Sequence, residues 1–401
     1  MNIFMKIWCR IYQFVFKLTM YVLPWRKAKT LIGANSLLLL PELIKSEGYD
    51  RVLIVTDKTL VKLGLINQLL EQLKKDNVEY VIYDETVPNP TVENVMDAYK
   101  LYKEGKSQGV IAFGGGSPMD CAKGVAAKVA CPKKDIVKME GLLKVSKHTP
   151  PIFAIPTTAG TGSEVTLAAV ITDAEKNHKL VINDTNLIPG YVVLDPVLTV
   201  GLPKHITSTT GLDALTHAVE AFIGNTRTKA TKAQAINATK LIFENIKRAY
   251  DDGSDLIARE NMLIASNLAG KAFTRSYVGY VHSIAHTLGG QYKVPHGLAN
   301  AIILPHILKW YGKKAHKKLV VLGRAVGIDG KTDEEISNKF IKEIENLKEY
   351  CDIPEKFENI IKDEDIPQMA KYSLKEANPL YPVPKLMGKK EMIAMYKHLK
   401  A

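Results

Sequence analysis

The 401-residue chain has few cysteines, and they are scattered. The four cysteines are Cys9, Cys121, Cys131 and Cys351, and no two of them form a CxxC pair. This spacing argues against a zinc ribbon or a dithiol redox motif. So few cysteines in a chain of this length are typical of a reducing compartment. We therefore predict a cytoplasmic protein.

A long uncharged hydrophobic run is also missing. A strongly apolar stretch, residues 3–23, is interrupted every three or four residues by a polar side chain: Lys6, Arg10, Gln13 and Lys17. This spacing predicts an amphipathic helix with a basic stripe, not a membrane span or a signal peptide. Two interpretations remain open. The helix packs on the body of the protein or on a partner subunit, or residues 1–24 make a weak contact with a membrane surface.

Acidic residues are in the minority, and the formal net charge is +12. Such an excess favours anionic ligands or surfaces. However, the lysines are spread along the chain without a dense basic block, and this spread favours a solvated lysine-rich surface as the explanation of the charge. No nucleic-acid-binding motif accompanies it, and we expect no binding of nucleic acid.

The two halves of the chain differ in their hydrophobic pattern. Short apolar runs in the first half predict strands at 51–57, 79–84, 109–116, 151–158 and 191–195, with helices at 60–75 and 91–106. After about residue 204 the pattern predicts helices at 206–223, 230–250, 254–273, 297–311, 333–350 and 388–400. We therefore predict an α/β N-terminal domain with a mostly parallel, doubly wound sheet, followed by an all-α C-terminal domain. The predicted domains are an N-terminal helix (1–24), a dinucleotide-binding domain (25–203) and a helical domain (204–401).

Two loops rich in glycine and hydroxyl groups follow predicted strands. In IAFGGGSPMDCAK (111–123) the glycines would let the backbone approach a phosphate, and the following helix would offer free N–H groups. In IPTTAGTGSEVT (155–166) the hydroxyls of Thr157 and Thr158 are suited to phosphate or ribose oxygens. Tight packing and helix capping are the respective alternatives. Two such loops at one edge of a sheet support a dinucleotide site more than either does alone.

Asp57 ends the first of the predicted strands, in the segment IVTDKTL. A carboxylate at this place would accept a hydrogen bond from the adenosine ribose and repel a 2′-phosphate. It would equally serve as the N-cap of the next helix. The sequence alone does not separate the two roles.

The second half holds a set of metal-binding side chains. Asp213 and His217 lie at i, i+4 in GLDALTHAVEAF, and His282 and His296 lie in VHSIAHTLGGQYKVPHG. Three imidazoles and a carboxylate suit a divalent transition metal, although a buried polar network is the alternative. His286 follows His282 by one helical turn, and it would be a fifth ligand, a proton relay or a support for the ligands.

Taken together, in this order and spacing, the four motifs resemble the iron-containing (group III) alcohol dehydrogenase family from about residue 27 to residue 401. The resemblance implies a dehydroquinate-synthase-like fold, with Fe(II) or alternatively Zn(II) held by Asp213, His217, His282 and His296, and with a catalytic His286. It also implies NAD(H) bound in the cleft between the two domains. The implied cofactor-binding residues are Asp57, Gly115, Gly116, Ser117, Asp120, Thr157, Thr158 and Lys179.

We therefore predict a metal-dependent, NAD-linked alcohol dehydrogenase or aldehyde reductase that acts on small primary alcohols or aldehydes. Hydride transfer would occur with the substrate oxygen on the metal. A zinc-type polyol dehydrogenase and a dehydroquinate-synthase-like lyase are alternatives on the same fold, and the Asp-His-His-His set argues against both. A non-catalytic scaffold subunit is a more remote alternative. By the same resemblance we expect a homodimer.

Overall fold

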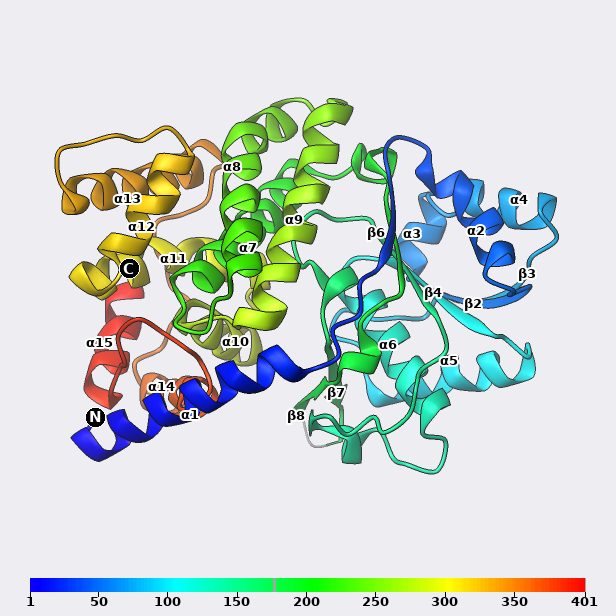
Figure 1. Cartoon of the computed structure of the whole chain (residues 1–401), viewed down its shortest axis with the longest axis horizontal. Helices are drawn as coiled ribbons and strands as arrows, with labels where there is room; N and C mark the ends of the chain where they lie inside the picture. The colour runs from blue at the N-terminus through cyan, green and yellow to red at the C-terminus, as the bar shows by residue number, and fades with distance from the viewer. Residues whose placement is uncertain (176–177, 401) are drawn as a thin grey trace. The chain divides into compact units, whose positions relative to one another are not determined.

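The computed structural model describes residues 1–175 and 178–400 and divides the chain into two compact units (Figure 1). The α/β unit comprises Pro24–Gly201 and Ser254–Leu263. The helical unit comprises Met1–Leu23, Leu202–Gly253 and Ile264–Ala401. The short segment Ser254–Leu263 thus belongs to the α/β unit, although it lies in the half of the chain where the sequence pattern is helical.

The α/β unit is built on a six-stranded sheet in the order β1-β9-β6-β4-β2-β3, and all neighbouring strands are parallel. The strands are β1 (Lys29–Ile32), β2 (Arg51–Val55), β3 (Glu79–Tyr83), β4 (Gly109–Gly114), β6 (Ile152–Pro156) and β9 (Tyr191–Leu194). All five predicted strands are present, and the predicted parallel, doubly wound sheet is confirmed. The short edge strand β1 was not predicted, because its four residues are only partly buried.

The strand order reverses between β2 and β4, since β3 extends the sheet on one side of β2 and β4 on the other. In parallel sheets of this kind, ligands bind at the carboxyl ends of the strands beside such a reversal. Asp57 directly follows β2, and the glycine-rich loop directly follows β4. The topology therefore brings two of the predicted cofactor segments to the same place.

Helices cover both faces of the large sheet. On one face, α2 (Leu40–Ser46) and α4 (Asn67–Lys75) pack on alternate residues of the strands, including Ile54, Ile111 and Phe153. The other face carries α5 (Val92–Glu104) and α6 (Gly116–Ala130). The predicted helix 60–75 is interrupted, because α3 (Lys58–Lys62) ends before Gly64, whose φ is +70°.

A second, three-stranded sheet was not predicted. It consists of β5 (Gly141–Leu142), β8 (His178–Asn183) and β7 (Ala168–Asp173), and β7 and β8 are antiparallel. Small and charged residues dilute the apolar pattern of both longer strands. Helix α6 packs closely on this sheet, since a Cβ on Gly124 would lie 2.7 Å from Ile171 Cδ1.

The described residues of the helical unit contain no strand beyond an isolated bridge. Its helices are α1 (Ile3–Val22), α7 (Lys204–Ile223), α8 (Lys229–Asp251), α9 (Leu256–Ser276), α10 (Tyr280–Tyr292), α11 (His296–Tyr311), α12 (His316–Ala325), α13 (Asp333–Tyr350), α14 (Ile366–Ala377) and α15 (Lys389–Leu399). Helix α9 begins in the segment that belongs to the α/β unit. Across the described chain, no helix is long and apolar enough to cross a membrane.

Candidate metal centre and cofactor loops

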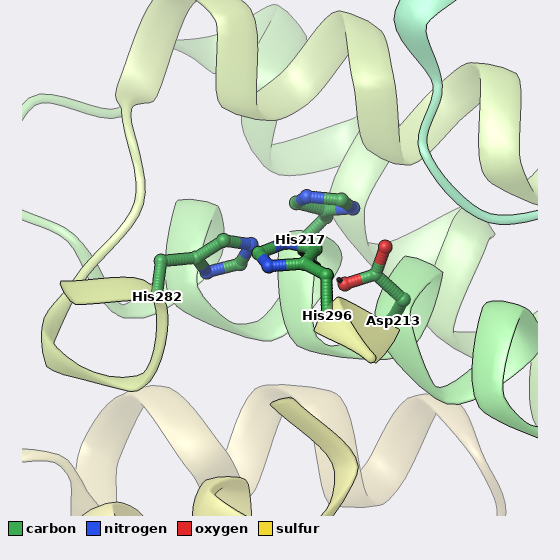
Figure 2. A group of neighbouring side chains, drawn as sticks. All are labelled: Asp213, His217, His282 and His296. Atoms are coloured by element: carbon green, nitrogen blue, oxygen red, sulfur yellow. Dashed lines mark ion pairs between the residues drawn. The ribbon is translucent and has the colours of Figure 1, made fainter. Parts of the chain in front are cut away.

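The four predicted metal ligands lie together in the helical unit. Asp213 and His217 are one turn apart on α7, His282 is on α10, and His296 is the first residue of α11. One ligand atom from each residue lies within 4.8 Å of the others. Figure 2 shows the three imidazoles and the carboxylate gathered around a common centre.

A glycine explains how α11 comes so close to α7. A Cβ on Gly297 would lie 2.5 Å from the carbonyl oxygen of Thr209, so any other residue would push the two helices apart. The neighbouring His296 is thereby placed with its Nε2 3.7 Å from Asp213 Oδ1.

Burial keeps His282 in the form that binds a metal. Asp213, His217 and His282 are each at most 4% exposed, whereas the His296 side chain is 41% exposed and opens the cluster to solvent. Burial, and then the neighbouring histidines, hold the pKa of His282 well below its usual value. A neutral imidazole can offer a nitrogen lone pair to a metal.

Glu220 is a functional residue that the sequence reasoning missed. It lies seven residues after Asp213 on α7, is 3% exposed, and its Oε2 is 2.7 Å from His282 Nδ1. The backbone N–H groups of Gly279 and Val281 also donate to this carboxylate, at 2.7 and 2.9 Å. Burial raises the pKa of Glu220 to about 7, although these hydrogen bonds oppose the shift. The carboxylate fixes the His282 ring so that Nε2 faces the other ligands.

Asn300 is a second residue that was missed. Its Nδ2 lies 2.6 Å from Asp213 Oδ1, 3.0 Å from His296 Nε2 and 3.3 Å from His282 Nε2. Three acceptor atoms thus converge on one donor in a buried place. A cation would satisfy the same atoms, and a set of three nitrogens and one carboxylate oxygen fits Fe(II) or Zn(II).

His286 lies beside this cluster but outside the group of four. Its ring stacks on His296, with the centroids 5.2 Å apart, and its side chain is 43% exposed. Its Nδ1 is 2.6 Å from Glu376 Oε1, and Tyr381 Oη donates to the same carboxylate oxygen. This arrangement orients an imidazole between the ligands and solvent, as a proton relay requires.

The two predicted cofactor loops lie side by side in the α/β unit. They follow β4 and β6, which pair with Gly114 opposite Pro156, and the Thr157 N–H donates to the Gly114 carbonyl at 3.2 Å. Gly114 has a φ of +146°, and a Cβ there would lie 2.6 Å from Pro118 Cγ. The chain then enters α6, with Gly115 as its N-cap. Backbone N–H groups at the start of this helix form a ready anion site.

A buried lysine holds the end of the second loop, residues 155–166, in place. Lys123 is fully buried, and its Nζ lies within hydrogen-bond distance, 2.9–3.1 Å, of the Ser163 hydroxyl, the Thr166 hydroxyl and the carbonyls of Thr166 and Ala168. Asp120, predicted to bind the cofactor, accepts a hydrogen bond from Ser163 Oγ at 3.3 Å. Burial raises the pKa of Asp120 to about 6, and the Lys123 charge opposes this shift.

Asn89, which the sequence reasoning did not single out, joins two other predicted residues. Its backbone N–H donates to Ser117 Oγ at 3.2 Å, and its Oδ1 accepts from Lys179 Nζ at 2.8 Å. The turn dipeptide Asn89-Pro90 was the available signal. Ser117 at the start of α6 and Lys179 on β8 are therefore brought near each other.

Asp57 is the N-cap of α3. Its Oδ1 accepts from the N–H groups of Thr59 and Leu60, at 2.9 and 3.0 Å. Capping is therefore one role of this residue, and contact with a ribose stays a prediction.

Comparisons with known proteins agree with this geometry. Residues 27–196 match the iron-containing alcohol dehydrogenase family, and residues 207–400 match the C-terminal part of the same family. The chain is 37% identical over 370 residues to the 1,3-propanediol dehydrogenase of Klebsiella pneumoniae, covering 91% of this chain and 95% of the relative. It is 35% identical over 346 residues to the lactaldehyde reductase of Escherichia coli (strain K12), covering 85% and 90%.

Solved structures give the same result. A crystal structure of a 1,3-propanediol oxidoreductase superimposes with a TM-score of 0.90 at 35% identity, covering 94% of this chain and 99% of the other. The sulfoacetaldehyde reductase of Bifidobacterium kashiwanohense, solved in complex with NAD+, superimposes with a TM-score of 0.85 at 26% identity and the same coverage. The chain therefore belongs to the iron-containing alcohol dehydrogenase family and is a metal-dependent oxidoreductase of alcohols and aldehydes.

Proposed function

We propose that this protein interconverts small aldehydes and primary alcohols, with NAD(H) as the hydride carrier and Fe(II), or alternatively Zn(II), as the metal. The observation that carries the proposal is the convergence of Asp213, His217, His282 and His296 on one buried centre. Its donor atoms fit a divalent metal, which would supply a Lewis acid to an alcohol or carbonyl group.

The residues around the centre have separate proposed roles. Asp213 and the three imidazoles hold the metal, and Glu220 positions His282. His286 carries a proton between the reacting group and solvent, with Glu376 holding its ring in place. The 43% exposure of the His286 side chain beside His296 supports this role.

The α/β unit would bind NAD(H) at the end of the sheet where the strand order reverses. Gly115, Gly116 and Ser117 would cradle the pyrophosphate, and Asp57 would favour NAD over NADP. The remaining proposed contacts are Asp120, Thr157, Thr158 and Lys179. The NAD+ complex of the sulfoacetaldehyde reductase supports this choice of cofactor.

The test is NADH oxidation by anaerobically purified, Fe(II)-loaded protein with a panel of short aldehydes, and with NADPH in parallel. The names of two relatives justify including lactaldehyde and the aldehyde of 1,3-propanediol. Turnover with NADH that stops on chelation and returns with Fe(II) would support the proposal. Protein that binds iron and NADH but turns over no aldehyde would instead point to a polyol substrate or to a lyase.

We also propose a location in the cell, an oligomeric state and a membrane contact for this protein. Four free, buried cysteines suit a reducing compartment and support a cytoplasmic location. The family resemblance supports a homodimer. The apolar, basic character of residues 1–24 supports a weak contact with a membrane surface.

A further inference from the structure

Helix α1 is fastened to the helical unit by a narrow stripe that contains polar side chains. Its buried residues, Cys9, Gln13, Phe16 and Met20, recur every three or four positions. Gln13 Nε2 donates to the carbonyls of Tyr381 and Pro379 at 2.7 and 3.1 Å. Hydrogen bonds to backbone, in addition to apolar packing, therefore decide which side of α1 faces inward.

Arg10 adds two more of these bonds. Its guanidinium donates to the carbonyls of Val383 and Pro384, at 2.7 and 3.0 Å. Phe16 contacts the edge of the Tyr277 ring, with the centroids 5.3 Å apart. In Figure 1, α1 runs along the lower edge of the helical unit.

The opposite side of α1 is apolar along its whole length. We define the outward face as the six residues Phe4, Ile7, Ile11, Phe14, Leu18 and Val22, which are 50–80% exposed. Their spacing of three or four residues places them on one side of the helix. Soluble proteins rarely leave so continuous an apolar surface in water, and such a surface usually contacts a partner or a membrane.

The charges around this face match an anionic surface. Lys6 and Lys17 are on the same flank of the helix, between the outward face and the buried stripe. Residues 1–41 contain six basic residues and no acidic one. Trp8, 53% exposed, lies at the edge of the outward face, where an indole suits the boundary between lipid and water.

A second copy of the chain fits the face less well. A helix of this length is about 30 Å long and presents a face about 10 Å wide. The contact area would be about 300 Å² per partner, against the ~800 Å² per partner of a standard stable interface.

We propose that α1, while docked through Arg10 and Gln13, lays its outward face into the surface of an anionic lipid bilayer. The docked helix would lie in the plane of the interface, with Lys6 and Lys17 at the headgroups. This inference rests on the proposed membrane contact of residues 1–24 and adds its partner and orientation. It is independent of the reaction at the metal centre.

The experiment is co-sedimentation of the full chain with vesicles of phosphatidylcholine alone and of equal parts phosphatidylcholine and phosphatidylglycerol. The main variant is Ile11→Ser combined with Phe14→Ser, and the matched control is Ile257→Ser, which removes an equally exposed apolar side chain from the α/β unit. Unfolding temperature and aldehyde turnover in solution, both expected to be unchanged, show that each variant is folded.

We expect the wild type and Ile257→Ser to bind the anionic vesicles. The double variant should bind at least about tenfold more weakly, since burying one large apolar side chain is worth roughly that factor. Binding should weaken in high salt and in a Lys6→Glu, Lys17→Glu variant.

Three results would overturn the inference. The first is no binding by the wild type, which would also sink the membrane contact itself. The second is binding that the double variant retains in full, which would leave a membrane contact but remove the outward face from it. The third is a soluble oligomer that the double variant breaks, without vesicle binding, which would make a second copy the occupant. Aldehyde turnover tests the proposed reaction separately in each case.

Discussion

The metal centre and the cofactor loops differ in the chemical groups from which they are built. The metal centre is made of side chains, which three helices bring together: Asp213 and His217 from α7, His282 from α10 and His296 from α11. The cofactor loops are made largely of backbone, with the left-handed Gly114, the N–H groups at the start of α6 and the carbonyls held by Lys123. We infer that loss of one side chain will abolish the first site, whereas the second will respond most to changes in backbone conformation.

The largest expected effect is that of His282→Ala. The substitution removes one of the four proposed ligands and leaves the buried Glu220 without its imidazole partner. Iron retention and turnover should both be abolished, while NADH binding persists. Metal analysis, turnover and NADH fluorescence titration measure the three properties. Full activity with retained iron would remove His282 from the ligand set.

His286→Ala should separate proton transfer from metal binding. His286 lies beside the ligands without joining them, so the variant should keep its iron. Turnover should fall about 100-fold or more, as is usual when a proton-transferring side chain is lost. A variant purified without iron would instead identify His286 as a ligand.

Glu220→Gln should weaken the metal centre without removing a ligand. The amide cannot offer two carboxylate oxygens to the His282 ring and to the N–H groups of Gly279 and Val281. Loss of such a partner typically lowers metal affinity about 10- to 100-fold. Competition with a chelator measures the affinity, and Glu343→Gln, at an exposed position, is the control. Equal affinities in the two variants would contradict the positioning role.

Gly114→Ala tests whether the cofactor loops depend on backbone conformation. Its φ of +146° and the 2.6 Å approach of a Cβ to Pro118 make any side chain costly here. A strain of about 1–3 kcal/mol should weaken NADH binding roughly tenfold. Iron content should not change. Gly201→Ala, where a Cβ meets no atom within 4 Å, is the matched control. Iron loss in the Gly114 variant would break the proposed separation of the two sites.

The smallest effect is expected for Asp57→Gly. Glycine replaces an N-cap at a cost of only a few tenths of a kcal/mol, so the variant should fold. Without the carboxylate, the ratio of NADH to NADPH activity should fall a few-fold. Parallel kcat/KM measurements with the two cofactors decide the question, and an unchanged ratio would leave Asp57 with its capping role alone.

The sequence predicted those parts of the fold and the sites that residue type alone specifies. The five predicted strands of the large sheet are short apolar runs, and the metal set combines three imidazoles with a carboxylate, which together suit a divalent metal. Glu220 and Asn300 were missed because an acid and an amide acquire their meaning only from partners on other helices. Asn89 was missed for the same reason, since it acts only where its turn meets Ser117 and Lys179. Strands β7 and β8 were missed because small and charged residues dilute their apolar pattern.

The N-terminal helix shows the same limit of prediction from sequence, because its contacts depend on distant residues. Its helical form was predicted from spacing and is confirmed as α1. The inward direction of Arg10 and Gln13 was not predictable, because their acceptors are backbone carbonyls about 370 residues away in the chain.

That separation has a consequence for the protein during its synthesis. Helix α1 leaves the ribosome before the carbonyls that hold it, which lie about 370 residues later, at residues 379–384. At 5–20 residues per second, the helix waits roughly 20–70 s for its docking site. During this time both its stripe and its outward face are open to chaperones and to any nearby bilayer. The nascent chain thus exposes a strongly apolar helix well before the segment that holds it has been made.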